Sequence, residues 1–307
     1  MNINDFSEKI RNQAQQELGN SFFVETGEVR KLNGVVFHNL TIHAENVNVA
    51  PSICLDPFYE MYIEGKSINK IVKDILKIYW DNSIGESIDV SYIYDYENVK
   101  DNIFFSLCNY EKNKELLEDI PYIPFLDLAI IFSIQIKNNL IEEGSVKISN
   151  YLMGKWRISI EDIMKQSLVN SSRLFGPKCF TMYEYFMSDI PGSEKLTDEQ
   201  KMLLELFKES MWIATNESFY RGASVIMYPK FLENFAEMVE SNYFILPSSI
   251  DEVILIPQKN ENHSYEETVS YLKSMVREVN FTSVNETDVL SDNVYYFSRS
   301  LGKVTVA

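Results

Sequence analysis

The sequence predicts an α+β protein with two domains, each a largely antiparallel sheet with helices packed on it. Three observations lead to this prediction. Short strand-like segments occur in consecutive pairs joined by turn residues, which is typical of antiparallel hairpins. Amphipathic helical segments separate these pairs. The chain has 307 residues and 45% hydrophobic content, and such a length favours two cores because domains usually hold roughly 100–200 residues.

The predicted N-terminal domain spans residues 1–175 and contains a β-hairpin at residues 22–43. Asn33 and Gly34 separate its two strands. This dipeptide favours a type I′ turn, because both central residues of that turn need a positive φ. A helix is expected at residues 3–18, where apolar side chains recur every three or four positions and need a surface to cover.

The rest of this domain is predicted to hold helices at residues 97–110 and 112–118, followed by strands within residues 125–149. The first of these strands, residues 125–137, alternates between a wholly apolar face and a mixed one. A period of two places successive side chains on opposite faces of a sheet, so the apolar face is expected to be core. Residues 145–149 then complete a second hairpin.

Residues 176–198 are predicted to connect the domains, since Ser188 to Ser193 contains a Pro-Gly turn signal. The C-terminal domain, residues 199–307, is expected to follow a ββα-ββα-ββ order. Its strand pairs are 211–215 with 223–228, 243–246 with 253–256, and 293–298 with 303–306, and its helices are 229–239 and 265–279.

The charge and the cysteines limit the partners and the compartment. Lys and Arg total 28 against 45 Asp and Glu, a net charge of −17, which repels nucleic acid and anionic lipid. We therefore expect no nucleic-acid and no membrane partner. The longest apolar run, residues 121–136, is too short to span a bilayer. The N-terminus lacks a secretory pattern and the three cysteines form no pair of motif spacing, so a cytoplasmic protein with reduced thiols is expected.

The sequence contains no recognised catalytic or nucleotide-binding motif. A phosphate loop, a dinucleotide-binding glycine pattern, a nucleophile elbow and an HExxH pair are all absent. No cofactor is therefore predicted. Any catalytic site would have to be assembled from residues that lie far apart in the chain.

His43, Asp56 and Glu60 are the candidates for such a dispersed site. Asp56 and Glu60 lie one helical turn apart and would suit a divalent cation or an acid and base pair. The simpler alternative, which the sequence favours, makes Asp56 an N-cap before Pro57. His38 shares the apolar face of its strand and is expected to be a hydrogen-bonded core residue, while His43 points to the opposite face.

Phe219, Tyr220 and Arg221 are the candidates for a protein contact. They are expected at an exposed hairpin tip within residues 217–221. Aromatic and Arg side chains commonly anchor interfaces.

A second polar group lies in the turn after the strand at residues 243–246. Pro247 is followed by Ser248, Ser249, Asp251 and Glu252, which are candidates for an acidic site at the mouth of the sheet. Ordinary turn chemistry explains the same residues, and the sequence favours that explanation.

Four segments resemble a bacterial family from Gram-positive anaerobes that is known by a domain-of-unknown-function label. They are GEVRKLNGVVFHNLTI at 27–42, LPSSIDEVILIP at 246–257, MVREVN at 275–280 and LSDNVYYF at 290–297. The resemblance covers nearly the whole chain. It implies a soluble cytosolic protein of two parts, and it implies no activity, cofactor or site residue.

Two functions are consistent with the sequence. The first is a non-catalytic interaction or accessory protein that works through protein contacts, favoured by the acidic charge and the lack of a reactive motif. The alternative is a metal-dependent or acid/base hydrolase whose His, Asp and Glu residues meet only in three dimensions. The sequence does not decide whether the protein is an enzyme, and it does not indicate the oligomeric state.

Overall fold

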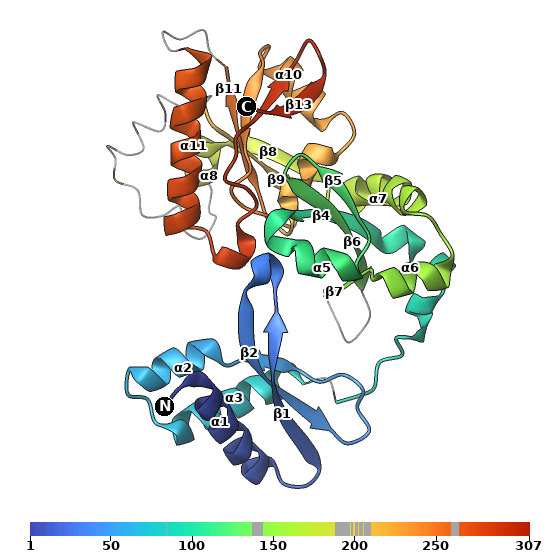
Figure 1. The fold of residues 1–307 in the computed structure, drawn as a ribbon, viewed down its shortest axis with the longest axis vertical. Helices are drawn as coiled ribbons and strands as arrows, with labels where there is room; N and C mark the ends of the chain where they lie inside the picture. Colours follow the sequence, from blue (N-terminus) through green and yellow to red (C-terminus); the bar gives the residue numbers. More distant parts are fainter. Residues whose placement is uncertain are drawn as a thin grey trace. The chain divides into compact units, whose positions relative to one another are not determined.

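The chain folds into two compact units, residues 1–93 and 94–307. The computed structural model describes residues 1–83, 85–136, 144–187, 210–258 and 264–307, with positions 197, 199, 202 and 205. Sheet A (β1-β2-β3) belongs to the first unit, and the four-stranded sheet B and six-stranded sheet C belong to the second. Every pairing among the described strands is antiparallel, and helices accompany each sheet (Figure 1). The predicted α+β class is confirmed.

The first unit packs three helices on one face of sheet A. Its elements are α1 (Ile3–Leu18), β1 (Phe22–Arg30), β2 (Val36–Ala44), β3 (Ser52–Cys54), α2 (Asp56–Ile63) and α3 (Ile68–Asn82). Asn33 and Gly34 have φ angles of 61° and 73°, which confirms the positive φ values expected for the turn between β1 and β2.

The core of this unit lies between the sheet and the helices. Leu40 and Ile42 of β2 pack there against Phe6 of α1 and Ile71 of α3, and all four side chains are buried. Burying such a side chain contributes about 1.5–3 kcal/mol relative to leaving it in water. The apolar side chains that recur along the helices and those that alternate along the strands therefore pack into one core.

Sheet B is built around its long strand β6. The elements of this part are α4 (Tyr96–Val99), β4 (Ile103–Asn109), α5 (Lys114–Asp119), β5 (Tyr122–Phe125), β6 (Leu128–Ile136), β7 (Gly144–Lys147), α6 (Asn150–Trp156) and α7 (Ile160–Leu174). β4 pairs with one edge of β6, while β5 and β7 pair in succession with the other. Residues 137–143 of the predicted second hairpin lie outside the described part of the chain.

The helix predicted at residues 97–110 is wrong for its second half. Residues 103–109 form β4, whose side chains from Ile103 to Cys108 are all buried. A strand covered on both faces is largely apolar, and Ile103 and Leu107 of β4 happen to continue the helical spacing that begins at Val99 of α4. α7 packs against β4, where Ser171 Oγ accepts a hydrogen bond from the Phe105 amide at 3.2 Å.

Sheet C has the strand order β13-β12-β10-β11-β9-β8. Its elements are β8 (Pro177–Thr181), α8 (Met182–Met187), β9 (Trp212–Asn216), the 3-10 helix η6 (Gly222–Met227), α10 (Phe231–Met238), β10 (Tyr243–Leu246), β11 (Val253–Pro257), α11 (Tyr265–Thr282), β12 (Tyr295–Ser298) and β13 (Lys303–Val306). Phe244 and Leu246 pack with α11 on one face. Tyr243 points to the other face, where its ring meets Phe235 of α10 at 4.8 Å.

Residues 223–228 do not form the strand that was expected to pair with residues 211–215. They belong mostly to η6, because β8 and β11 already occupy the two edges of β9. β8, Pro177–Thr181, comes from the segment predicted as a connection. The long-range pairing of β8 therefore replaced a local hairpin.

The division into units also differs from the predicted boundary at residues 176–198. Asp127, in the turn between β5 and β6, accepts hydrogen bonds from Ser291 Oγ at 2.6 Å, Asn293 Nδ2 at 2.9 Å and Tyr295 OH at 2.5 Å. Sheet B and sheet C are thereby held in one unit. Residues 188–196 and 198 of the predicted connection lie outside the described chain.

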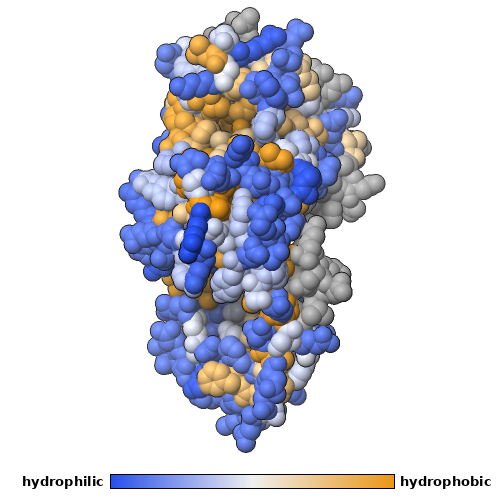
Figure 2. Space-filling view, turned by 90° about the vertical axis from the view of Figure 1, so that its right-hand side faces the viewer, coloured by the Kyte–Doolittle hydropathy of each residue, from blue (hydrophilic) through white to orange (hydrophobic). Residues whose placement is uncertain are grey.

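The surface is mainly hydrophilic on the side that Figure 2 shows. Hydrophobic side chains gather around a hollow near the top of that view, at the height of α10 and β13 in Figure 1. Within the described ranges, no helix has both the length and the apolar character needed to cross a bilayer.

Candidate functional site

The loop at residues 217–221 joins β9 to η6 and has a defined backbone conformation. Phe219 and Arg221 adopt φ angles of 54° and 52°, in the left-handed region that non-glycine residues rarely occupy. The buried Asn216 side chain stabilises this shape: its Nδ2 donates to the Tyr220 carbonyl at 2.7 Å, and its Oδ1 accepts from Ser218 Oγ at 2.9 Å. The loop is therefore organised by a residue that the sequence analysis did not single out.

The turn at residues 247–252 anchors the end of this loop. Asp251 Oδ1 accepts a hydrogen bond from the Arg221 amide at 2.8 Å, and the Asp251 carbonyl accepts one from Thr215 Oγ1 at 2.7 Å. Ser249 Oγ accepts from the Asp251 amide at 3.0 Å and so fixes the carboxylate's backbone. The structure thus brings together the loop candidates and the turn candidates, although Arg221 and Asp251 lie 30 residues apart in the sequence.

Gly222 allows this close approach. A Cβ at this position would lie 2.0 Å from Thr215 Oγ1 and 2.3 Å from the Asp251 carbonyl oxygen. Such distances are incompatible with a side chain unless the backbone moves, so glycine is required by packing. No turn motif in the sequence marks this requirement.

Burial perturbs the two carboxylates of the turn. Desolvation raises the pKa of Asp251, opposed by the hydrogen bond from the Arg221 amide and by the Arg221 charge. Desolvation also raises the pKa of Glu252, and the neighbouring Asp251 charge adds to this effect. Ser248 helps to hold the turn in place through its backbone, because its carbonyl accepts a hydrogen bond from the Leu290 amide at 3.0 Å.

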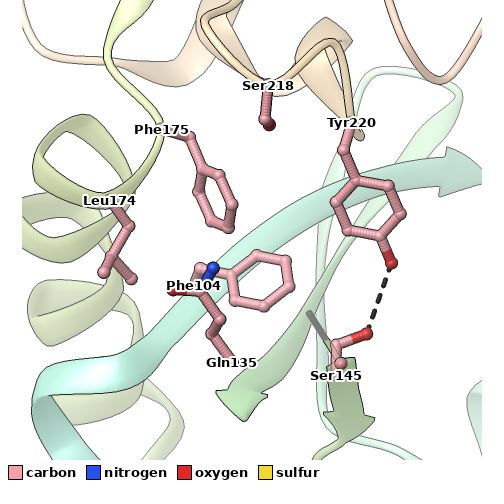
Figure 3. A pocket seen from close by; sticks show the side chains of 8 residues that line it. Phe104, Gln135, Ser145, Leu174, Phe175, Ser218 and Tyr220 are labelled. Atoms are coloured by element: carbon pink, nitrogen blue, oxygen red, sulfur yellow. Dashed lines mark hydrogen bonds between the residues drawn. The ribbon is translucent and has the colours of Figure 1, made fainter. Parts of the chain in front are cut away.

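Tyr220 forms one wall of a cavity of about 270 Å³ (Figure 3). Phe104 of β4 and Phe175 at the end of α7 point into it with their ring centroids 4.9 Å apart and their planes at 67°. The Tyr220 hydroxyl lies 3.3 Å from Ser145 Oγ of β7. The remaining lining residues are Gln135, Gly144, Leu174 and Ser218.

The lining residues that the structure describes are apolar at the floor and polar but uncharged at the rim. Among the lining residues that the structure describes, the Tyr220 phenol is the one titratable group. A carboxylate or phosphate would lose its hydration here without a cationic partner among the described lining residues, whereas an uncharged group would not carry that cost. The cavity suits an apolar or aromatic group with a hydrogen-bonding substituent.

The three predicted contact residues differ in exposure. The side chains of Phe219 and Tyr220 are 39% and 42% exposed. Lys178 Nζ lies 4.7 Å from the centre of the Phe219 ring, and the Arg221 guanidinium carbon lies 5.6 Å from that of Tyr220. Arg221 Nη1 is buried and makes no hydrogen bond within the described chain. The loop leads into a 3-10 helix, and so it is not the hairpin tip that was expected.

His43 and Asp56 contact different partners on opposite faces of β2. His43 Nε2 lies 2.8 Å from Glu25 Oε1. His38 is the histidine beside Asp56: its ring Nδ1 lies 3.3 Å from Asp56 Oδ1, and its amide donates to Asp56 Oδ2 at 2.8 Å. Residues 38 and 43 are separated by an odd number of positions and therefore face apart. The structure does not bring His43 to Asp56.

Asp56 is also not the helix cap that was expected. It is the first residue of α2, Leu55 occupies the N-cap position, and no side chain there makes a capping bond. The Asp56 carboxylate instead binds the neighbouring strand. Glu60 is exposed on α2.

The thiols and the acidic side chains form no metal-binding cluster in the ranges that the structure describes. No group of three or more His, Cys, Asp or Glu side chains there is arranged to hold a metal ion. Cys54 Sγ donates to Asp56 Oδ2 at 3.4 Å, and burial raises the pKa of this thiol. Burial raises the pKa of Cys108 to about 12, so this thiol stays protonated and unreactive at neutral pH.

Residues 3–299 match the model of a family of unknown function, DUF5688. The match covers nearly the whole chain, as the resemblance of the four segments predicts. No curated protein and no solved structure shows a significant match.

Proposed function

This chain belongs to the DUF5688 family, whose function is unknown, and we propose that it is a non-catalytic interaction protein that contacts a protein partner through the loop at residues 217–221. The observation that carries the proposal is an exposed aromatic pair on a loop fixed from two sides. Asn216 holds the loop from within, and Asp251 holds its end at Arg221.

A fixed loop of this kind has the physical properties of a binding site. Phe219 and Tyr220 expose large apolar rings, which supply contact area at a small cost in side-chain entropy. Their backbone is already ordered before binding, so association loses less conformational entropy than it would with a mobile loop. The proposed contact residues remain Phe219, Tyr220 and Arg221, with Arg221 acting mainly through its backbone bond to Asp251.

The alternative, an acid/base hydrolase, has one supporting observation. Asp251 and Glu252 have raised pKa values, and perturbed carboxylates occur in catalytic sites. The Asp251 carboxylate, however, holds a backbone amide in the same unit, which is a structural use. We therefore place the partner contact ahead of hydrolysis.

The proposal includes a bacterial source and a cytoplasmic location. Cys54, Cys108 and Cys179 are all free thiols, as is usual for proteins of a reducing compartment. The net charge of −17 supports a protein partner over nucleic acid or an anionic membrane.

Affinity capture from the native cell, followed by measurement of Kd with the purified partner, tests this proposal. The test compares the wild-type chain with the double variant Phe219→Ala, Tyr220→Ala. Truncating two aromatic anchors is expected to weaken binding by at least about thirtyfold, that is, by about 2 kcal/mol. Phe281→Ala is the matched control, because Phe281 is the 91% exposed aromatic of α11.

The control is expected to bind like the wild type. The proposal is wrong if the double variant, shown to be folded by its circular dichroism, binds the partner with unchanged affinity. It is also wrong if the native cell yields no reproducible partner.

A further inference from the structure

We propose that the cavity beside Tyr220 binds a small molecule with one uncharged aromatic ring and a hydroxyl or amide substituent. This site goes beyond the proposed partner contact and does not depend on it. The floor, the rim, the uncharged character of the described lining and the size of the cavity all favour such a ligand (Figure 3).

The floor is a preformed aromatic surface. Phe104 and Phe175 are 2% and 7% exposed and meet edge to face at 4.9 Å. Phe104 is fixed in β4, where it pairs with Ser133 of β6. Aromatic rings pack well in offset or edge-to-face geometry, so a third ring can contact this pair without rearrangement of the strand.

The rim offers hydrogen bonds from neutral groups. The hydroxyls of Tyr220 and Ser145 lie 3.3 Å apart, and a hydroxyl both donates and accepts. Ser218 Oγ donates to Asn216 Oδ1 and keeps its own lone pairs as acceptors. A hydroxyl or amide on the ligand ring would therefore find both donors and acceptors at the rim.

The size and the mouth of the cavity favour a small molecule over the side chain of a partner. About 270 Å³ lies just below the roughly 300–1,000 Å³ typical of sites for drug-sized ligands, which leaves space for one ring system. The Tyr220 to Ser145 contact joins the loop to β7 at one side of the cavity. A partner's side chain could enter the cavity only if the partner's backbone passed beside this contact, whereas a free small molecule has no such backbone.

Titration of the full chain with phenol, toluene and benzoate, followed by ligand-observed NMR, tests the site. Phenol is expected to bind saturably. Toluene is expected to bind more weakly than phenol, because it cannot use the rim hydroxyls. Benzoate is expected to bind at least about tenfold more weakly than phenol, because its charge would be desolvated among neutral groups.

Two variants locate the binding. Leu174→Trp places a larger side chain in the cavity wall and is expected to abolish phenol binding. Val169→Trp is the matched control, since Val169 is 67% exposed on the same helix α7 and does not line the cavity. Ser145→Ala is expected to weaken phenol binding by about threefold to tenfold and to leave toluene binding unchanged.

The site is refuted if the wild-type chain shows no saturable phenol binding. It is also refuted if a folded Leu174→Trp variant binds phenol like the wild type, or if benzoate binds as tightly as phenol. If Leu174→Trp does not fold, the Ser145→Ala comparison decides: an equal loss of phenol and toluene, or no loss of phenol, contradicts the site.

Discussion

Two aspartates in different units make the same bond in different surroundings. Asp56 accepts from the His38 amide at 2.8 Å, and Asp251 accepts from the Arg221 amide at 2.8 Å. Asp56 also lies beside the His38 ring, and the amide that it binds belongs to a regular strand. Asp251 instead holds the end of an irregular loop, beside a second half-buried carboxylate, that of Glu252.

The difference supports the proposal that the partner contact lies on the loop at residues 217–221. In the first unit a carboxylate–amide bond joins a helix to a sheet that already has its ladder hydrogen bonds. In the second unit the same bond fixes a loop that contains two left-handed residues, a conformation that persists only where its surroundings enforce it. A carboxylate that enforces such a loop is the feature expected of a preorganised site.

Gly222→Ala should have the largest effect on the loop at residues 217–221 and on its contact with the turn at residues 247–252. The added Cβ would meet the Asp251 carbonyl, a backbone atom that cannot simply rotate away. We expect a loss of at least about 3 kcal/mol in the free energy of unfolding, measured by urea denaturation.

Gly154→Ala is the matched control. Gly154 lies inside α6 with no atom within 4 Å of an added Cβ, so this change should stabilise the protein by about 0.5–1 kcal/mol. A Gly222→Ala variant within about 1 kcal/mol of the wild type would show that the contact between η6 and the turn is not needed.

Asp251→Ala and Asp56→Ala compare the two bonds directly. Each variant leaves one amide without its acceptor and should cost about 1–2 kcal/mol. Hydrogen exchange should then accelerate at residues 217–221 in the first variant and at His38 in the second. Faster exchange at residues 217–221 in Asp56→Ala, or none there in Asp251→Ala, would contradict the assigned roles.

Glu252→Gln should change the pH dependence of the protein's stability, and this effect should be smaller than those of Gly222→Ala and Asp251→Ala. Burial raises the pKa of Glu252 above its ordinary value of 4.5. Its contribution to stability is therefore full below the unfolded-state pKa and is lost as pH rises through the folded-state pKa. The glutamine variant lacks this loss, so its Tm relative to the wild type should rise as pH increases from about 4.5 to 7.

Glu60→Gln gives the baseline for replacing an exposed glutamate on a helix. The prediction for Glu252 is wrong if the two glutamine variants show the same change in relative Tm across this range.

The sequence predicted what depends on local chemistry. The α+β class, the positive φ at Asn33 and Gly34, and the helix that follows Ser264 were all foreseen, and the structure shows a capping box between Ser264 and Glu267. Each depends on residues within a few positions of one another.

The features that were missed depend on contacts between distant segments. β8 occupies the edge of β9 that a local hairpin would have used, and Asp127 joins sheet B to residues 291–295. The loop residues Phe219 to Arg221 were named as candidates, and so were the turn residues Ser248, Ser249, Asp251 and Glu252, but the convergence of the two groups depends on the sheet order. The cavity is formed from β4, β6, β7, α7 and the loop at residues 217–221, and no local pattern marks its lining.

Hydrogen exchange of the chain with and without a partner obtained by affinity capture tests whether the loop at residues 217–221 is the partner contact. Partner binding is expected to slow exchange at residues 217–221 and to leave the exposed end of α11 around Phe281 unchanged. Slower exchange elsewhere in the chain, with none at residues 217–221, would contradict it.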